Sequence, residues 1–165
     1  MLQHNIDPKY SQFFLDTCAF DPKYTPEDCA ANELWSRYEA EKVSLLLAHS
    51  NQREIDHPNT PKWVKNKALS MVFTVEVQLN SEELSRLVKL EQLLRGNAQS
   101  ERHKDDARHL FEASKYGGYF VTTDHRILKM ADEIFQQCRV QVLKPSGLIH
   151  RLDLGDGAYA SLPHC

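Results

Sequence analysis

The chain has 165 residues, the size of one ordinary domain and enough to bury a hydrophobic core. Its formal net charge of −3 argues against an overall basic nucleic-acid-binding protein, although a local basic rim can coexist with an acidic site. No apolar run approaches the roughly 20 residues that a membrane-spanning helix requires, so we expect no membrane partner.

In the first half of the chain, two short apolar runs are each followed by a helical pattern. Phe13–Asp16 predicts a short buried strand. Thr25 is a good N-cap for a helix over residues 26–41, with proline at its first position. Val43–Ala48 has the nearly continuous apolar composition of a strand that is covered on both faces. A serine or an asparagine at 50–51 can cap the helix that follows.

The second half of the chain continues this alternation. Phe73–Leu79 alternates apolar and polar residues, which predicts a half-exposed strand. Asn80 can cap a helix over residues 81–94, which the pair Gly96-Asn97 ends. The remaining helix, strand, helix and strand are predicted at 102–115, 119–123, 125–137 and 140–143.

Strands that alternate with helices predict an α/β fold with a parallel sheet. Residues 1–165 contain no internal repeat, so we expect a single domain, with a loose tail from about residue 150. In that tail, Asp153 and Asp156 are expected to solvate a turn. The four cysteines have neither paired nor zinc-like spacing and no signal peptide precedes them, which predicts reduced thiols and a cytoplasmic location.

Four carboxylates each follow an apolar run or lie in the first turn of a predicted helix. They are Asp16, Glu54, Asp106 and Asp124. Residues at the carboxyl ends of parallel strands converge on one crevice. Carboxylates in one crevice repel each other unless a cation lies among them, and hard ions such as Mg²⁺ prefer oxygen ligands. The pattern therefore predicts a metal site for phosphate chemistry.

Each of these acids also has a purely structural explanation. Asp16 can cap a strand-to-loop turn, Asp124 can cap the next helix, and the helix dipole favours Glu54 in a first turn. On the helix over residues 102–115, Asp106 lies beside the buried stripe whereas Asp105 points to water. The metal-site interpretation thus depends on the joint arrangement, and it selects Asp106 over Asp105.

Several segments together resemble one family pattern. They are Phe14–Thr17, Glu54 after a strand, Asp106–Ala113, Tyr119–Asp124 and Val140–Pro145. The chain resembles the PIN-domain nuclease family over nearly its whole length, except for residues 73–79 and the tail beyond Leu148. The resemblance implies a three-layer α/β/α domain with a central parallel sheet that binds Mg²⁺ or Mn²⁺ and cleaves RNA. By position, it makes Asp16, Glu54, Asp106 and Asp124 the catalytic, metal-binding acids, with Thr17 and Thr123 as supporting hydroxyls.

Basic residues near these acids are candidates for RNA phosphate contacts. They are Arg53, Arg126 and Lys129. Lys62–Lys67 combines three lysines with Trp63, which suits a grip on an RNA strand, but the favoured interpretation is an amphipathic helix with Trp63 in the core. We expect His109 to be packed and hydrogen-bonded and Cys18 to be a small buried residue.

The resemblance implies a metal-dependent endoribonuclease. Many small stand-alone members of that family are toxins held inactive by an antitoxin, so a VapC-like toxin is the leading hypothesis. The alternatives are a PIN nuclease in RNA processing or turnover without an antitoxin, and a PIN-fold binding module without catalysis, against which the intact acids argue. A phosphatase-type hydrolase would want an Asp-x-Asp pair, whereas Asp16 precedes Thr17 and Cys18. The RNA target, an antitoxin partner and a homodimer all stay open.

Overall fold

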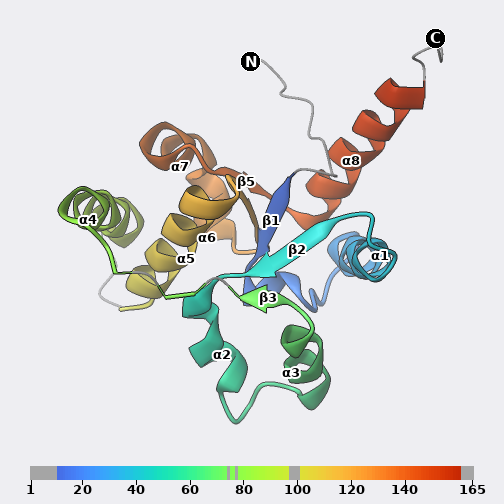
Figure 1. The fold of residues 1–165 in the computed structure, drawn as a ribbon, viewed down its shortest axis with the longest axis horizontal. Coiled ribbons are helices and arrows are strands. Elements are labelled where there is room, and N and C mark those ends of the chain that lie inside the picture. Colours follow the sequence, from blue (N-terminus) through green and yellow to red (C-terminus); the bar gives the residue numbers. More distant parts are fainter. Residues whose placement is uncertain (1–10, 74, 77, 97–100, 161–165) are drawn as a thin grey trace.

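The central layer of the protein is a five-stranded sheet, seen in a computed structural model that describes residues 11–73, 75–76, 78–96 and 101–160 (Figure 1). The strands are β1 (Gln12–Leu15), β2 (Ser44–Leu47), β3 (Val72–Phe73), β4 (Tyr119–Val121) and β5 (Gln141–Leu143). Their order is β3-β2-β1-β4-β5, and each neighbouring pair is parallel. The carboxyl ends of β1, β2 and β4 therefore lie along one edge of the sheet.

Helices connect the strands and form the two outer layers. They are α1 (Glu27–Glu39), α2 (Gln52–Asp56), α3 (Lys62–Leu69), α4 (Ser81–Arg95), α5 (Arg102–Tyr116), α6 (His125–Lys129), α7 (Ala131–Cys138) and α8 (Pro145–Ala160). Short 3₁₀ turns lie at Thr17–Ala19 and His49–Asn51. None of the helices in the described part of the chain combines the length and the apolar composition needed to cross a bilayer.

Side-chain alternation along β1 explains why the sheet has two covered faces. Successive residues of a strand point to opposite faces. Phe13 belongs to the hydrophobic core that includes Trp35 of α1 and Leu152 of α8. Phe14 belongs to the other core, together with Leu110 of α5. Figure 1 shows α1 and α8 on one side of the sheet and α4, α5 and α7 on the other, so the predicted three-layer α/β/α fold with a central parallel sheet is confirmed.

The end of α5 packs closely against β1 and requires a glycine. A Cβ on Gly117 would lie 2.7 Å from the backbone oxygen of Gln12 and 2.9 Å from the ring of Phe14. Real Cβ atoms do not approach a backbone oxygen so closely. Gly117 therefore allows the return from α5 into β4 to pass directly over β1.

The predicted strand over residues 73–79 is wrong for the part that is described. β3 ends at Phe73, and residues 75–76 and 78–79 have no strand structure; positions 74 and 77 lie outside the described residues. Val75 is 80% exposed, so the apolar side chains of this alternating pattern do not all pack against another element.

Helix ends differ from the sequence prediction in two places. Thr25 does not cap α1, because the N-cap position is Pro26 and has no side-chain hydrogen bond. The single helix predicted over residues 125–137 is two helices, α6 and α7, with Met130 between them as the C-cap of one and the N-cap of the other. Asn80, by contrast, caps α4 as predicted and forms a capping box with Glu83.

The loose tail predicted from about residue 150 is also wrong as far as residue 160, because α8 extends to Ala160. Leu148 and Leu152 are 0% and 1% exposed and belong to the same core as Phe13. Arg37 of α1 donates to Asp153 Oδ1 (2.7 Å). The segment is helical because this apolar face has α1 and the sheet to pack against.

Candidate carboxylate site

Asp16 lies directly beyond the carboxyl end of β1, where the sheet holds it in place. Its backbone N–H donates to the carbonyl of Val121 (2.8 Å), which continues the pairing of β1 with β4. Only 6% of the residue is exposed. Its Oδ2 accepts hydrogen bonds from the Thr122 hydroxyl (2.7 Å) and the Cys18 thiol (3.3 Å). Parallel strand pairing thus brings this carboxylate to the end of β4.

Thr122 connects the acid after β1 with the acid after β4. It is fully buried, and its hydroxyl donates to Asp16 and accepts from the backbone N–H of Asp124 (3.0 Å). The sequence pattern alone does not single out this residue. The signal lies in the strand register: Phe14 pairs with Phe120, so the same pairing, extended by two residues, sets Asp16 opposite Thr122.

The two hydroxyls proposed from the resemblance have other partners. Thr123 donates from Oγ1 to the Cys18 carbonyl (3.2 Å), which ties the loop after β4 to the turn after β1. Thr17 donates to Glu54 Oε2. Since Thr17 directly follows Asp16, this bond brings Glu54 to the edge where β1 ends.

Asp124 is the N-cap of α6 and is paired with an arginine. Its Oδ1 accepts from the backbone N–H of Arg126 (2.8 Å), and its Oδ2 accepts from Arg126 Nη2 (2.6 Å). Burial of the carboxyl group opposes its ionisation, but the hydrogen bonds from Arg126 outweigh burial and lower the pKa of Asp124. The structural explanation for Asp124, a helix cap, is therefore correct, and the residue nevertheless lies at the site.

Asp106, on the first turns of α5, shares the same arginine. Arg126 Nη2 donates to Asp106 Oδ2 (3.2 Å). The pKa of Asp106 is raised to about 6, first because burial disfavours the charged carboxylate and then because Asp16 is negative, while Arg126 offsets part of the increase. Asp124 raises it slightly further. Arg126 joins Asp106 to Asp124, and Thr122 joins Asp124 to Asp16, so the three acids are neighbours. Asp105 is exposed, as its helix phase predicted.

Glu54 lies in the first turn of α2, as predicted, and its side chain is exposed. It accepts from the Thr17 hydroxyl, and its backbone carbonyl accepts from Thr60 Oγ1 (2.7 Å) in the loop before α3. The fourth acid is therefore connected to the Asp16 segment through Thr17.

Cys18 is exposed as a residue, so the prediction of a buried cysteine is wrong. Its sulfur contacts Asp16, Thr122 and the backbone N–H of Thr123. Removal of the sulfur from water, and then the negative charge of Asp16, raise the pKa of the thiol to about 11. Cys18 is therefore a protonated donor to Asp16 at neutral pH.

The three proposed phosphate contacts have different surroundings. Arg126 binds two of the acids, and its hydrogen bond to Asp124 raises its own pKa further. Arg53 and Lys129 are exposed and form no ion pair with any residue that the structure describes. These two cations are therefore free to meet a phosphate.

A divalent cation such as Mg²⁺ requires oxygen ligands that lie close together. Among the described residues, no group of three or more His, Cys, Asp or Glu side chains is arranged so that it could hold a metal ion. The donor chemistry nevertheless fits, because the neighbouring carboxylates are hard oxygen ligands and the Arg126 guanidinium already acts as a cation between Asp106 and Asp124. An ion bound by both of these acids would have to displace that guanidinium.

A buried polar pair lies next to these acids. His109 is fully buried, as expected, and its Nδ1 lies 3.2 Å from Asn51 Nδ2. The positive form of His109 favours the ionised form of Asp106. The sequence predicts Asn51 as a possible helix cap, yet it makes no side-chain capping bond and instead fixes the turn before Glu54 against α5.

Four of the proposed residues thus come together at the carboxyl ends of β1 and β4, and Glu54 reaches them through Thr17. They are Asp16, Asp106, Asp124 and Arg126. A scan against models of known protein families and a search of curated proteins gave no match for this chain.

Proposed function

We propose that this protein is a metal-dependent endoribonuclease of the PIN type. The main support is the meeting of Asp16, Asp106 and Asp124 near the carboxyl ends of two neighbouring parallel strands, where burial and then the negative charge of Asp16 raise the pKa of Asp106 to about 6. Such a concentration of negative charge disfavours folding in the absence of a cation, which makes it costly for a purely structural site. The resemblance of the sequence to PIN nucleases agrees with this chemistry.

A bound metal ion and two groups of residues would contribute to cleavage. A bound Mg²⁺ or Mn²⁺ would supply a hydroxide nucleophile and neutralise charge on the phosphate. Thr122 fixes the Asp16 carboxylate through a 2.7 Å hydrogen bond, so this ligand is oriented before an ion binds. Arg126 neutralises Asp106 and Asp124 in this structure, and with an ion bound there its guanidinium would be available to the RNA phosphate, together with Arg53 and Lys129.

The test is cleavage of labelled single-stranded RNA by the purified protein. We expect cleavage with Mg²⁺ or Mn²⁺ and none in excess EDTA, and we expect Asp16→Asn to abolish it while the protein stays folded by circular dichroism. Asp106→Asn should lose most of the activity, on the order of 100-fold or more, because it removes a charged ligand. The matched control is Asp105→Asn, one residue away and exposed, which should remain near wild type.

Cleavage that persists in EDTA would rule out the metal mechanism, and equal losses in the Asp105 and Asp106 variants would rule out this assignment of the acids.

The leading biological role is that of a toxin held inactive by an antitoxin. That role requires a short antitoxin-like reading frame directly upstream, whose product should suppress both cleavage and the growth defect caused by the chain alone. Nuclease activity without such a neighbour would favour RNA processing or turnover instead.

A further inference from the structure

Helix α3 presents an exposed tryptophan, against the sequence prediction. Trp63 is 42% exposed, whereas Val64 and Ala68 form the buried face of the helix. The Lys67 ammonium lies over two indoles, 4.4 Å from the ring centre of Trp35 and 5.7 Å from that of Trp63. Since Trp35 is a core residue, Lys67 connects the exposed ring to the body of the protein and restricts its position.

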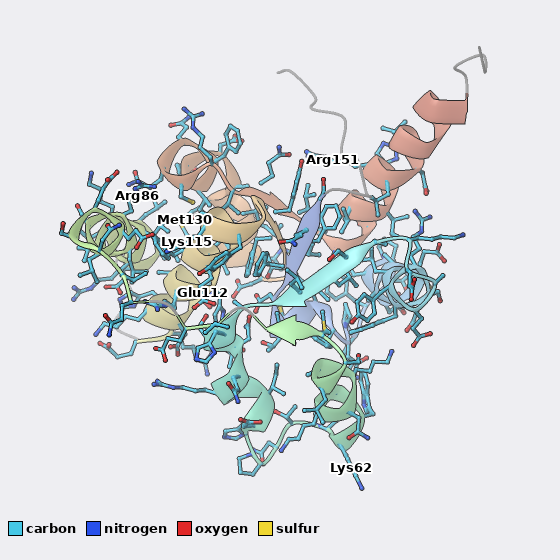
Figure 2. All side chains as sticks on the ribbon, viewed as in Figure 1. Lys62, Arg86, Glu112, Lys115, Met130 and Arg151 are labelled. Atoms are coloured by element: carbon cyan, nitrogen blue, oxygen red, sulfur yellow. The ribbon has the colours of Figure 1, made fainter. Side chains whose placement is uncertain are left out.

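The charge on this helix is unbalanced. α3 has the sequence KWVKNKAL, with three lysines and no acidic residue. None of Lys62, Lys65 and Lys67 forms an ion pair with a residue that the structure describes. Figure 2 shows Lys62 projecting from the free end of α3. In a chain with a net charge of −3, this helix is a local positive surface.

Helix α3 is also attached to the carboxylate site. Lys65 Nζ donates to the carbonyl of Asp56 at the end of α2 (3.4 Å), and the Thr60 hydroxyl in the connecting loop donates to the carbonyl of Glu54 (2.7 Å). α2 and α3 lie side by side beyond the β3 edge of the sheet (Figure 1). A chain that leaves the site beside Glu54 and crosses α2 therefore meets α3 next.

We propose that α3 is a binding surface for single-stranded RNA, on which a base stacks against Trp63 while Lys62 and Lys65 contact the flanking phosphates. The proposal rests on the proposed nuclease function for the identity of the ligand, but not on the chemistry of cleavage. Stacking on an exposed aromatic ring together with lysine contacts is the usual way in which proteins hold a single strand without reading its sequence. The excess of lysine over acid favours a polyanion over a protein partner.

The experiment measures the affinity for a labelled 12-nucleotide RNA of mixed sequence by fluorescence anisotropy, in EDTA so that the RNA stays intact. Trp63→Ala should weaken binding by about 5- to 150-fold, the range for loss of one base stack. Trp63→Phe keeps an aromatic face and should retain most of the affinity. Lys62→Gln should make the slope of log affinity against log salt shallower by about 0.7.

The matched control is Leu69→Ala, because Leu69 is 80% exposed on the same helix but has no ring for a base. Its affinity should stay within about twofold of wild type. Unchanged binding by Trp63→Ala, or an equal loss in Leu69→Ala, would overturn the proposal. Because EDTA removes the metal, the binding result is independent of catalysis. RNA binding that depends on Trp63, in a protein that does not cleave RNA when metal is added, would refute only the nuclease. RNA cleavage together with an unchanged affinity of Trp63→Ala would refute only this surface.

Discussion

Asp106 and Asp124 hydrogen-bond to the same guanidinium, yet their pKa values move in opposite directions. Asp124 accepts bonds from both the backbone and the side chain of Arg126, and its pKa is lowered. Asp106 receives a single longer bond of 3.2 Å, is more deeply buried and faces Asp16, and its pKa is raised from 3.8 to about 6. The electrostatic strain of the site is therefore concentrated on Asp106.

The first prediction concerns metal-free stability at pH 7. A carboxyl group whose pKa is raised by folding destabilises the folded state once it ionises, so the wild type loses stability as the pH rises from about 4 to above 6. Asp106→Asn should remove this loss, stabilising by on the order of 1–3 kcal/mol and raising the melting temperature by several degrees at pH 7 but not at pH 4. Thermal unfolding followed by circular dichroism in EDTA measures both values.

Asp124→Asn is the matched comparison, since it also removes one negative charge from the site. Because the pKa of Asp124 is lowered, its ionised form stabilises the folded state above the unfolded pKa, and that contribution disappears as the pH falls. This variant should melt at or below the wild-type temperature at pH 7, even though asparagine still caps α6. A higher melting temperature for Asp124→Asn than for Asp106→Asn would show that the strain lies elsewhere.

At the scale of elements, the site depends on how α5 and β1 meet. Asp106 belongs to α5 and Asp16 follows β1, so the contact between these two elements sets the separation of their carboxylates. Gly117 allows that contact because its hydrogen takes the place of a Cβ beside Gln12 and Phe14.

The second prediction tests this contact. Gly117→Ala should destabilise the protein by about 1–3 kcal/mol, because the backbone oxygen 2.7 Å from the new methyl group cannot move without displacing β1. The control is Gly147→Ala in α8, where nothing lies within 4 Å of the added Cβ. That variant should be neutral or more stable by up to about 1 kcal/mol, since alanine is the better helix former. Urea unfolding compares the two, and a similar stability for both variants would contradict the close packing of α5 on β1.

At the scale of the whole molecule, α8 joins residues near the end of the described chain to α1 near its beginning. This last helix packs against α1 and adds Leu148 and Leu152 to the core on that face of the sheet. Helix α8 therefore stabilises the helical layer on the face of the sheet opposite to α5.

The third prediction follows from that packing. Leu152→Ala should cost about 2–5 kcal/mol of unfolding free energy, as is usual when a fully buried leucine is truncated. Leu154→Ala, two residues later on the same helix but 55% exposed, should change stability by less than about 0.5 kcal/mol. Chemical denaturation measures both, and a small effect of Leu152→Ala would return this segment to the loose tail that the sequence had predicted.

The sequence by itself indicated the alternation of strands and helices and the acids that the structure brings together. Dense apolar runs such as Phe13–Leu15 and Leu45–Leu47 are typical of strands that are covered on both faces, and both runs are buried here, so they predict strands without knowledge of their neighbours. The position of Asp16 after such a run, and the helix phase that separates Asp106 from Asp105, are likewise local properties.

Tertiary structure decided what depends on partners distant in the chain. Thr122 became the link between two acids through the register of β1 with β4, and register is set by pairing across more than 100 residues. Arg126 binds acids rather than solvent because the first turns of α5 and α6 lie next to each other. Trp63 is exposed and α8 is ordered for the same reason: whether an apolar face is covered depends on which element packs against it, and that is decided only when the layers assemble.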